Sequence, residues 1–171
     1  MSFYRTSAIS LTAFLLLLNG VGIAAAGELS MDDAKIVAAY PLTMDKVQRK
    51  FAVAADLGRL SVTDPALQSQ LQSINEGKSL DEQIKAFSAV PKAAAAMQAH
   101  GISTRDYCLT TLALGYALMP RAPAQFRQAN SPPDPSDVAA PPDHVEFVQA
   151  HMDEIHQLTA AIMQARKEAL H

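Results

Sequence analysis

The sequence predicts an all-α protein: a single-domain bundle of about six helices around a central hydrophobic helix at residues 104–119. Apolar residues recur at helical spacing along most of the chain, and capping residues or prolines mark the helix starts. Strand-like alternation of useful length does not appear. A chain of this size can bury enough apolar surface to fold without disulfides, so residues 27–171 are expected to form one domain.

Residues 1–26 have the pattern of a signal peptide. Arg5 gives a weakly positive start, residues 8–23 are apolar, and Ala24, Ala25 and Ala26 offer a small-residue cleavage site. Cleavage after Ala26 predicts a periplasmic or secreted protein. The alternative is an uncleaved anchor, because the apolar run is nearly long enough to span a bilayer. After the leader, no apolar run reaches that length.

The first helices of the expected mature chain are identified by their start signals. Ser30 and Thr43 are N-capping residues, Asp64 is a capping residue followed by a proline, Ser79 and Glu82 form a capping box, and Pro91 opens an alanine-rich segment. These signals predict helices over about residues 31–40, 43–60, 64–75, 79–89 and 91–100. Gly101 is expected to end the last of them.

The helix at residues 104–119 is the most hydrophobic of the mature chain. Ser103 is its expected capping residue, and past its first turn only Thr110 and Thr111 are polar. A helix that is apolar all round is expected at the centre of a bundle. The single cysteine, Cys108, cannot form an internal disulfide, and its apolar neighbours predict that it is buried and inert.

Residues 120–142 carry seven prolines and are expected to form a loop that crosses the bundle, because prolines exclude a helix interior. Asp143 and Glu146 then have the spacing of a capping box for a long final helix towards Leu170.

The histidines of this final helix are the first candidates for a functional site. On a continuous helix His144, His151 and Ile155 share one face, so His151 is expected to point into the core as a hydrogen-bonded structural residue. The alternative is a metal-binding protein or an enzyme with a site around His151, Glu154 and Tyr107.

Sequence motifs support no catalytic, cofactor-binding or metal-ligating assignment. The histidines lack the i,i+4 spacing of helical metal ligands, so a metal site would also need His100 or the proline-rich loop. Nucleophile and covalent-haem motifs are missing from the sequence, and no cofactor is expected. The formal net charge of −3, without a basic cluster, argues against nucleic acid as a partner.

Two stretches, Gly101–Tyr107 and Val145–Glu154, resemble segments of small exported helical proteins of Gram-negative bacteria, a group with no assigned function. The resemblance implies a periplasmic helical domain and transfers no catalytic residue. The signal peptide, the expected helical core, the lack of a reaction motif and the proline-rich loop favour a non-enzymatic binding module that takes a periplasmic protein or a small apolar ligand.

Overall fold

The computed structural model describes residues 29–74, 79–119 and 134–171, and all regular structure within these ranges is helical. The helices are α2 (Met31–Ala38), α3 (Met44–Thr63), α4 (Pro65–Ser73), α5 (Leu80–Ser88), α6 (Pro91–Ala99), α7 (Thr104–Leu118), α8 (Pro135–Ala139), α9 (Pro142–Ala150) and α10 (Met152–Glu168). The all-helical prediction is therefore confirmed for the described ranges. The predicted leader and its cleavage site lie outside them.

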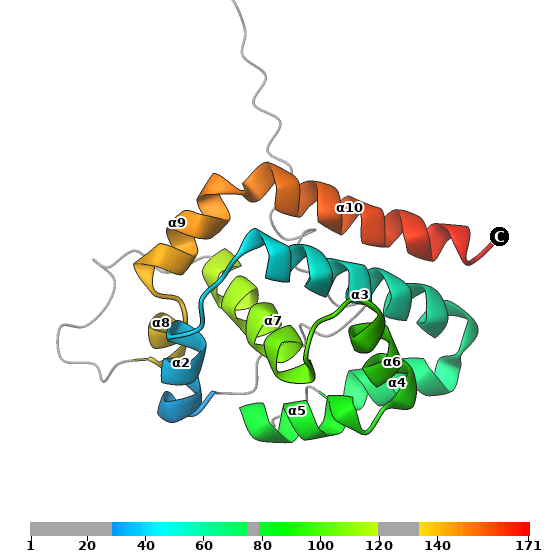
Figure 1. The fold of residues 1–171 in the computed structure, drawn as a ribbon, viewed down its shortest axis with the longest axis horizontal. Helices are drawn as coiled ribbons and strands as arrows, with labels where there is room; N and C mark the ends of the chain where they lie inside the picture. The colour runs from blue at the N-terminus through cyan, green and yellow to red at the C-terminus, as the bar shows by residue number, and fades with distance from the viewer. Residues whose placement is uncertain (1–28, 75–78, 120–133) are drawn as a thin grey trace, which may run out of the picture.

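Helix α7 lies near the middle of the molecule, where it contacts α2, α3, α5, α6, α8 and α9 (Figure 1). Its buried side chains include Tyr107, Cys108 and Leu114. Since few of its positions face solvent, the apolar sequence of this helix matches its central place.

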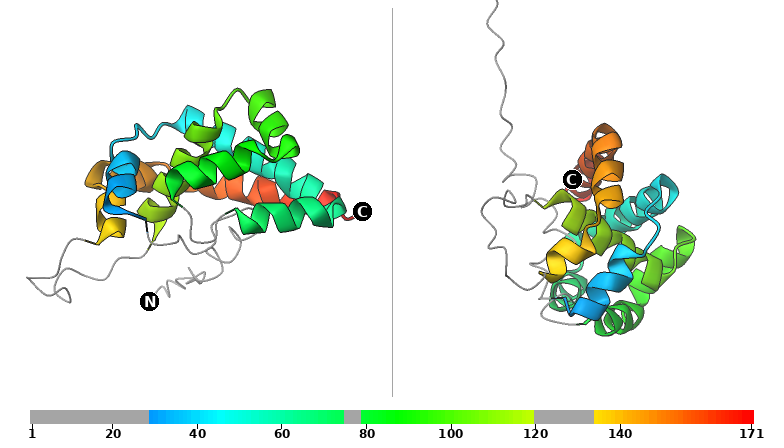
Figure 2. Two further views of the ribbon diagram at one scale, coloured as in Figure 1. Left: turned by 90° about the horizontal axis from the view of Figure 1, so that it is seen from below. Right: turned by 90° about the vertical axis from the view of Figure 1, so that its left-hand side faces the viewer.

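Helix α3 lies between α10 and α6. On one side α10 lies along it, and on another side it packs against α6 (Figure 1). Gly58 permits the close approach of α10, because a Cβ atom at this position would lie 3.1 Å from Cγ of Arg166. Seen from two further directions, α2 and α8 lie together at one end of the molecule (Figure 2).

Two apolar clusters hold these helices together. The large cluster draws buried side chains from α2 to α8, among them Val53, Leu57 and Tyr107. The small cluster joins α3 and α7 to α9 and α10, and its buried members are Val47, Phe51, Leu114, Val148 and Ile155.

The predicted capping signals of the first helices are confirmed. Ser30 accepts a hydrogen bond from the backbone of Asp33, Asp64 accepts one from Leu67 over 3.0 Å, and the Ser79 capping box is complete. Gly101 adopts the left-handed φ of 61° that a helix-ending glycine commonly takes. In the part of the chain that the structure describes, no helix has the length and apolar character needed to cross a membrane.

The predictions for the C-terminal part need correction. The described ranges contain nine helices instead of about six, because α8 is an additional helix and the predicted final helix is divided at His151, where φ is −113° and ψ is 18°. The predicted capping box is wrong as well. Pro142 occupies the first helical position of α9, which places Pro141 at the N-cap and Asp143 already inside the first turn.

The predicted proline-rich loop is also partly helical. Pro135 begins the short helix α8, and the side chain of Asp134 accepts a hydrogen bond from the backbone of Ser136 over 2.8 Å. Proline is compatible with a helix at its first position, where its missing N–H has no intrahelical partner anyway. The stretch 120–133 of the predicted loop lies outside the described residues.

Candidate functional site

An open groove of about 430 Å³ runs between α3 and α6. Its lining residues come from these two helices: Asp56, Arg59 and Leu60 of α3, and Lys92, Ala95, Ala96 and Ala99 of α6. We call this the α3–α6 groove.

The apolar part of the groove is made of small side chains. Ala95 and Ala99 are exposed on α6, while the opposite side of this helix sends Ala93 and Met97 into the large cluster. Leu60 adds a larger apolar surface and is 38% exposed. The alanines keep the groove open, because a larger side chain at these positions would fill it.

The charged residues that line the groove belong to two ion pairs, and Asp64 is the one member of these pairs outside the lining. Arg59 pairs with Asp56 one helical turn away, and Lys92 Nζ lies 2.6 Å from Asp64 Oδ2. Both cationic side chains are 52% exposed, whereas the two carboxylates are 29% and 28% exposed. The hydrogen bond from Lys92 and the backbone N–H of Leu67 hold the pKa of Asp64 below its usual range.

His100 lies at the end of α6 and joins this charged part through Asp56. Its Nε2 atom lies 2.7 Å from Asp56 Oδ2. Partial burial acts to raise the pKa of Asp56, but the bonds from His100 and Arg59 outweigh it, so the pKa is lowered. Sequence reasoning missed this pair, because Asp56 and His100 lie on different helices. The sequence signal was only that Asp56 falls on the polar face of its helix.

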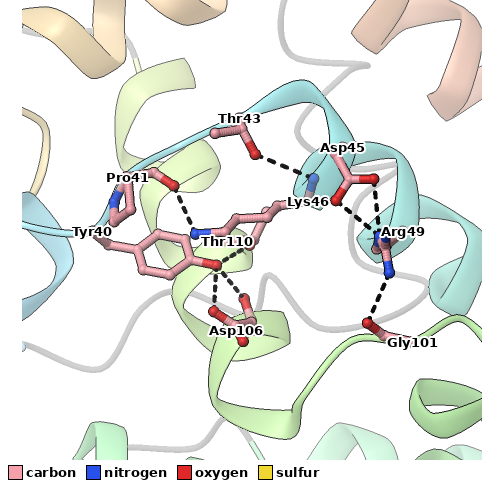
Figure 3. Close-up of polar contacts among 9 residues, drawn as sticks. All are labelled: Tyr40, Pro41, Thr43, Asp45, Lys46, Arg49, Gly101, Asp106 and Thr110. Atoms are coloured by element: carbon pink, nitrogen blue, oxygen red, sulfur yellow. Dashed lines mark hydrogen bonds and ion pairs between the residues drawn. The ribbon is translucent and has the colours of Figure 1, made fainter.

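A second polar network lies around Tyr40 and Asp106 (Figure 3). The Tyr40 hydroxyl donates to Asp106 Oδ1 over 2.9 Å and lies 3.1 Å from Thr110 Oγ1, while Ser103 Oγ donates to Asp106 Oδ2 over 2.5 Å. The bond from Ser103 lowers the pKa of Asp106 against the effect of partial burial, and Tyr40 adds to the lowering. A carboxylate bonded in this way joins the turn before α3 to α7 and is a poor proton acceptor.

Two basic residues extend this network along α3 (Figure 3). Lys46 Nζ donates to the Pro41 carbonyl over 3.0 Å and lies 4.1 Å from the centroid of the Tyr40 ring. Arg49 pairs with Asp45, which lies four residues earlier on the same helix, and also donates to the Gly101 carbonyl over 3.0 Å. These contacts fix the start of α3 to the α6–α7 turn, so we interpret the network as structural.

The buried, hydrogen-bonded histidine of the C-terminal region is His144, not His151 as predicted. His144 is 3% exposed, and its Nε2 atom lies 2.8 Å from the Tyr40 carbonyl oxygen. Since a carbonyl only accepts, Nε2 carries the hydrogen, and the buried Nδ1 atom has no hydrogen-bond partner among the residues that the structure describes.

His151 does not point into the core, because it is the residue at which the helix breaks, whereas His144 and Ile155 on either side of the break are both buried. Its side chain is 39% exposed, and the centroid of its ring lies 4.7 Å from the centroid of the Phe147 ring.

The structure brings together only part of the alternative site. His151 Nδ1 lies 3.9 Å from Glu154 Oε2, and Glu154 also accepts a hydrogen bond from Gln48 over 2.7 Å. Tyr107, however, is 2% exposed and packs edge-to-face on Phe87 in the large cluster. The described ranges contain no group of three or more histidine, cysteine or acidic residues placed to hold a metal ion.

The predicted burial of Cys108 is confirmed. The side chain is 2% exposed, and burial raises the pKa of its thiol to about 12. A thiol with this pKa is protonated at neutral pH, and thiolate chemistry is therefore disfavoured.

Comparisons with protein-family models, curated proteins and solved structures found no match for this chain. The resemblance to exported helical proteins stays a prediction, and the α3–α6 groove is interpreted from its own geometry and charges.

Proposed function

We propose that this chain is an exported, non-enzymatic binding protein whose α3–α6 groove binds a small, largely apolar molecule. The observation that carries this proposal is the groove itself, with its alanine-rich lining and a volume of about 430 Å³. Ligand sites in proteins are usually concave, mostly apolar and a few hundred Å³ in volume.

The two helices that form the groove are well anchored. Leu57 of α3 and Ala93 of α6 are each 0% exposed and belong to the large cluster. A groove formed by anchored helices needs little ordering when a ligand binds, and less of the binding free energy is lost.

The second candidate is an enzyme that uses His100, held by Asp56, as a general base. An imidazole oriented by a carboxylate is a common arrangement for this role. His100 is not among the residues that line the groove, and these residues include no serine, threonine or cysteine that such a base could activate. The site around His151, Glu154 and Tyr107 has less support, because Tyr107 is buried against Phe87. We therefore favour binding.

The test uses the neutral dye N-phenyl-1-naphthylamine, whose fluorescence rises in apolar surroundings. We expect saturable binding to the protein and at least about a tenfold loss of affinity in Ala95→Phe, which fills the groove. Ala160→Phe is the matched control, because Ala160 is an exposed alanine of α10. Absence of saturable binding, or equal affinities in Ala95→Phe and the unmodified protein, would contradict the proposal.

A further inference from the structure

The charged groups that line the α3–α6 groove, and Asp64 beside it, differ in how many of their hydrogen-bonding positions are occupied. Asp56 accepts from Arg59 through Oδ1 and is bonded to His100 through Oδ2. Asp64 accepts from the Leu67 backbone through Oδ1 and from Lys92 through Oδ2. Each carboxylate oxygen of the two ion pairs thus already has a partner.

The two cationic side chains, in contrast, have N–H donors that make no hydrogen bond with the described residues. Arg59 bonds only through one terminal nitrogen and Lys92 makes one bond, within the parts of the chain that the structure describes. A guanidinium and an ammonium both carry further N–H donors. The groove therefore presents N–H donors that make no hydrogen bond beside carboxylates that already accept at both oxygens.

The exposed fractions of the charged side chains also favour a negatively charged ligand. The cations are 52% exposed and their carboxylate partners less than a third exposed, so an incoming molecule meets the positive groups first. Arg59 belongs to α3 and Lys92 to α6, which places one cation on each side of the groove. A carboxylate could accept from both without breaking either ion pair, because each cation has spare donors.

We infer that the α3–α6 groove selects an amphiphile with one apolar chain and one carboxylate, whose chain contacts Leu60 and the alanines and whose carboxylate binds Arg59 and Lys92. This inference rests on the proposed function, since it specifies the ligand of the same groove. The apolar contacts supply affinity for the chain, and the spare donors discriminate among head groups. An alkyl ammonium is disfavoured, because it would meet the two exposed cations before the less exposed carboxylates.

The inference is tested by calorimetric titration with decanoate, decanol and decyltrimethylammonium, each below the concentration at which it forms micelles. We expect decanoate to bind about tenfold more tightly than decanol, and decyltrimethylammonium to bind most weakly. The double variant Arg59→Met/Lys92→Met should bind decanoate no better than decanol, with its affinity for decanol unchanged. Lys167→Met removes an exposed cation of α10 and is the matched control.

The outcomes separate the two proposals. Equal affinities for decanoate and decanol would overturn the carboxylate inference and leave the apolar groove intact. Failure of all three amphiphiles and of the neutral dye to bind would overturn both. A loss of decanoate binding in Lys167→Met as large as in the double variant would show a general effect of charge, which also contradicts the inference.

Discussion

The two apolar clusters differ in how completely they enclose their helices. In the large cluster, α7 contacts helices on several sides and has buried residues in each of its turns. In the small cluster, the long helix α10 packs mainly on α3, and its only buried residues are Ile155 and Thr159. The difference indicates that α7 unfolds only together with the whole protein, whereas α10 can unfold locally while the rest stays folded.

A pair of core truncations is the strongest test of this difference. Leu57 in the large cluster and Ile155 in the small cluster are both 0% exposed. Leu57→Ala should lower the free energy of unfolding by about 2–5 kcal/mol, because it leaves a cavity among helices that cannot close it. Ile155→Ala should act mainly on α10. We expect hydrogen exchange to accelerate in α10 while the amides of α7 stay protected.

Equal acceleration of exchange in α7 and α10 after Ile155→Ala would show that both clusters unfold as one cooperative unit. Urea unfolding of the two variants, followed by circular dichroism, supplies the matching change in overall stability.

Lys50 allows a second test, because it is a charged residue on the buried face of α3. It is 3% exposed, its Nζ atom lies 4.3 Å from the centroid of the Phe51 ring, and no carboxylate of the described residues pairs with it. Burial lowers its pKa from 10.5 to about 8. The native state therefore holds this proton less tightly than the unfolded chain does.

The sign of the resulting pH dependence follows from this shift. Below pH 8 the full cost of burying the ammonium is present, and it is relieved as the pH rises from 8 through 10.5. We expect Lys50→Met to raise the free energy of unfolding at pH 7 by about 3 kcal/mol, and by roughly half as much at pH 9.5.

The measurement is the difference between Lys50→Met and the unmodified protein in urea unfolding at the two pH values. Taking this difference cancels the titration of the tyrosines, which both proteins share. A less stable Lys50→Met variant at pH 7 would mean that the ammonium is stabilised in the native state.

The sequence predicts the helices of the large cluster better than α9 and α10 of the small cluster, and the reason is physical. A capping residue such as Ser30 or Ser79 acts on its own helix, so its effect is visible within a few residues. The break at His151 lacks such a signal, since no proline or glycine marks it. Pairs such as Asp56 with His100 depend on how α3 and α6 pack, which local sequence does not encode. The candidate groove was therefore beyond sequence reasoning.

His144 and His151 provide the last and smallest test, because only His144 connects the C-terminal helices to the turn before α3. His144 of α9 donates to the Tyr40 carbonyl in the turn before α3, whereas His151 lies half-exposed at the break between α9 and α10. His144→Ala leaves that buried carbonyl without its donor and should cost about 1–3 kcal/mol.

His151→Ala should stay within about 0.5 kcal/mol of the unmodified protein, because it removes no buried hydrogen bond. His144→Phe keeps an aromatic ring without the donor. If it is as unstable as His144→Ala, the hydrogen bond and not the volume of the ring holds α9 in place. If instead His151→Ala proves the more unstable variant in thermal unfolding, the connection of the C-terminal helices to the rest of the protein runs through the α9–α10 break, and His144 is only a space-filling residue.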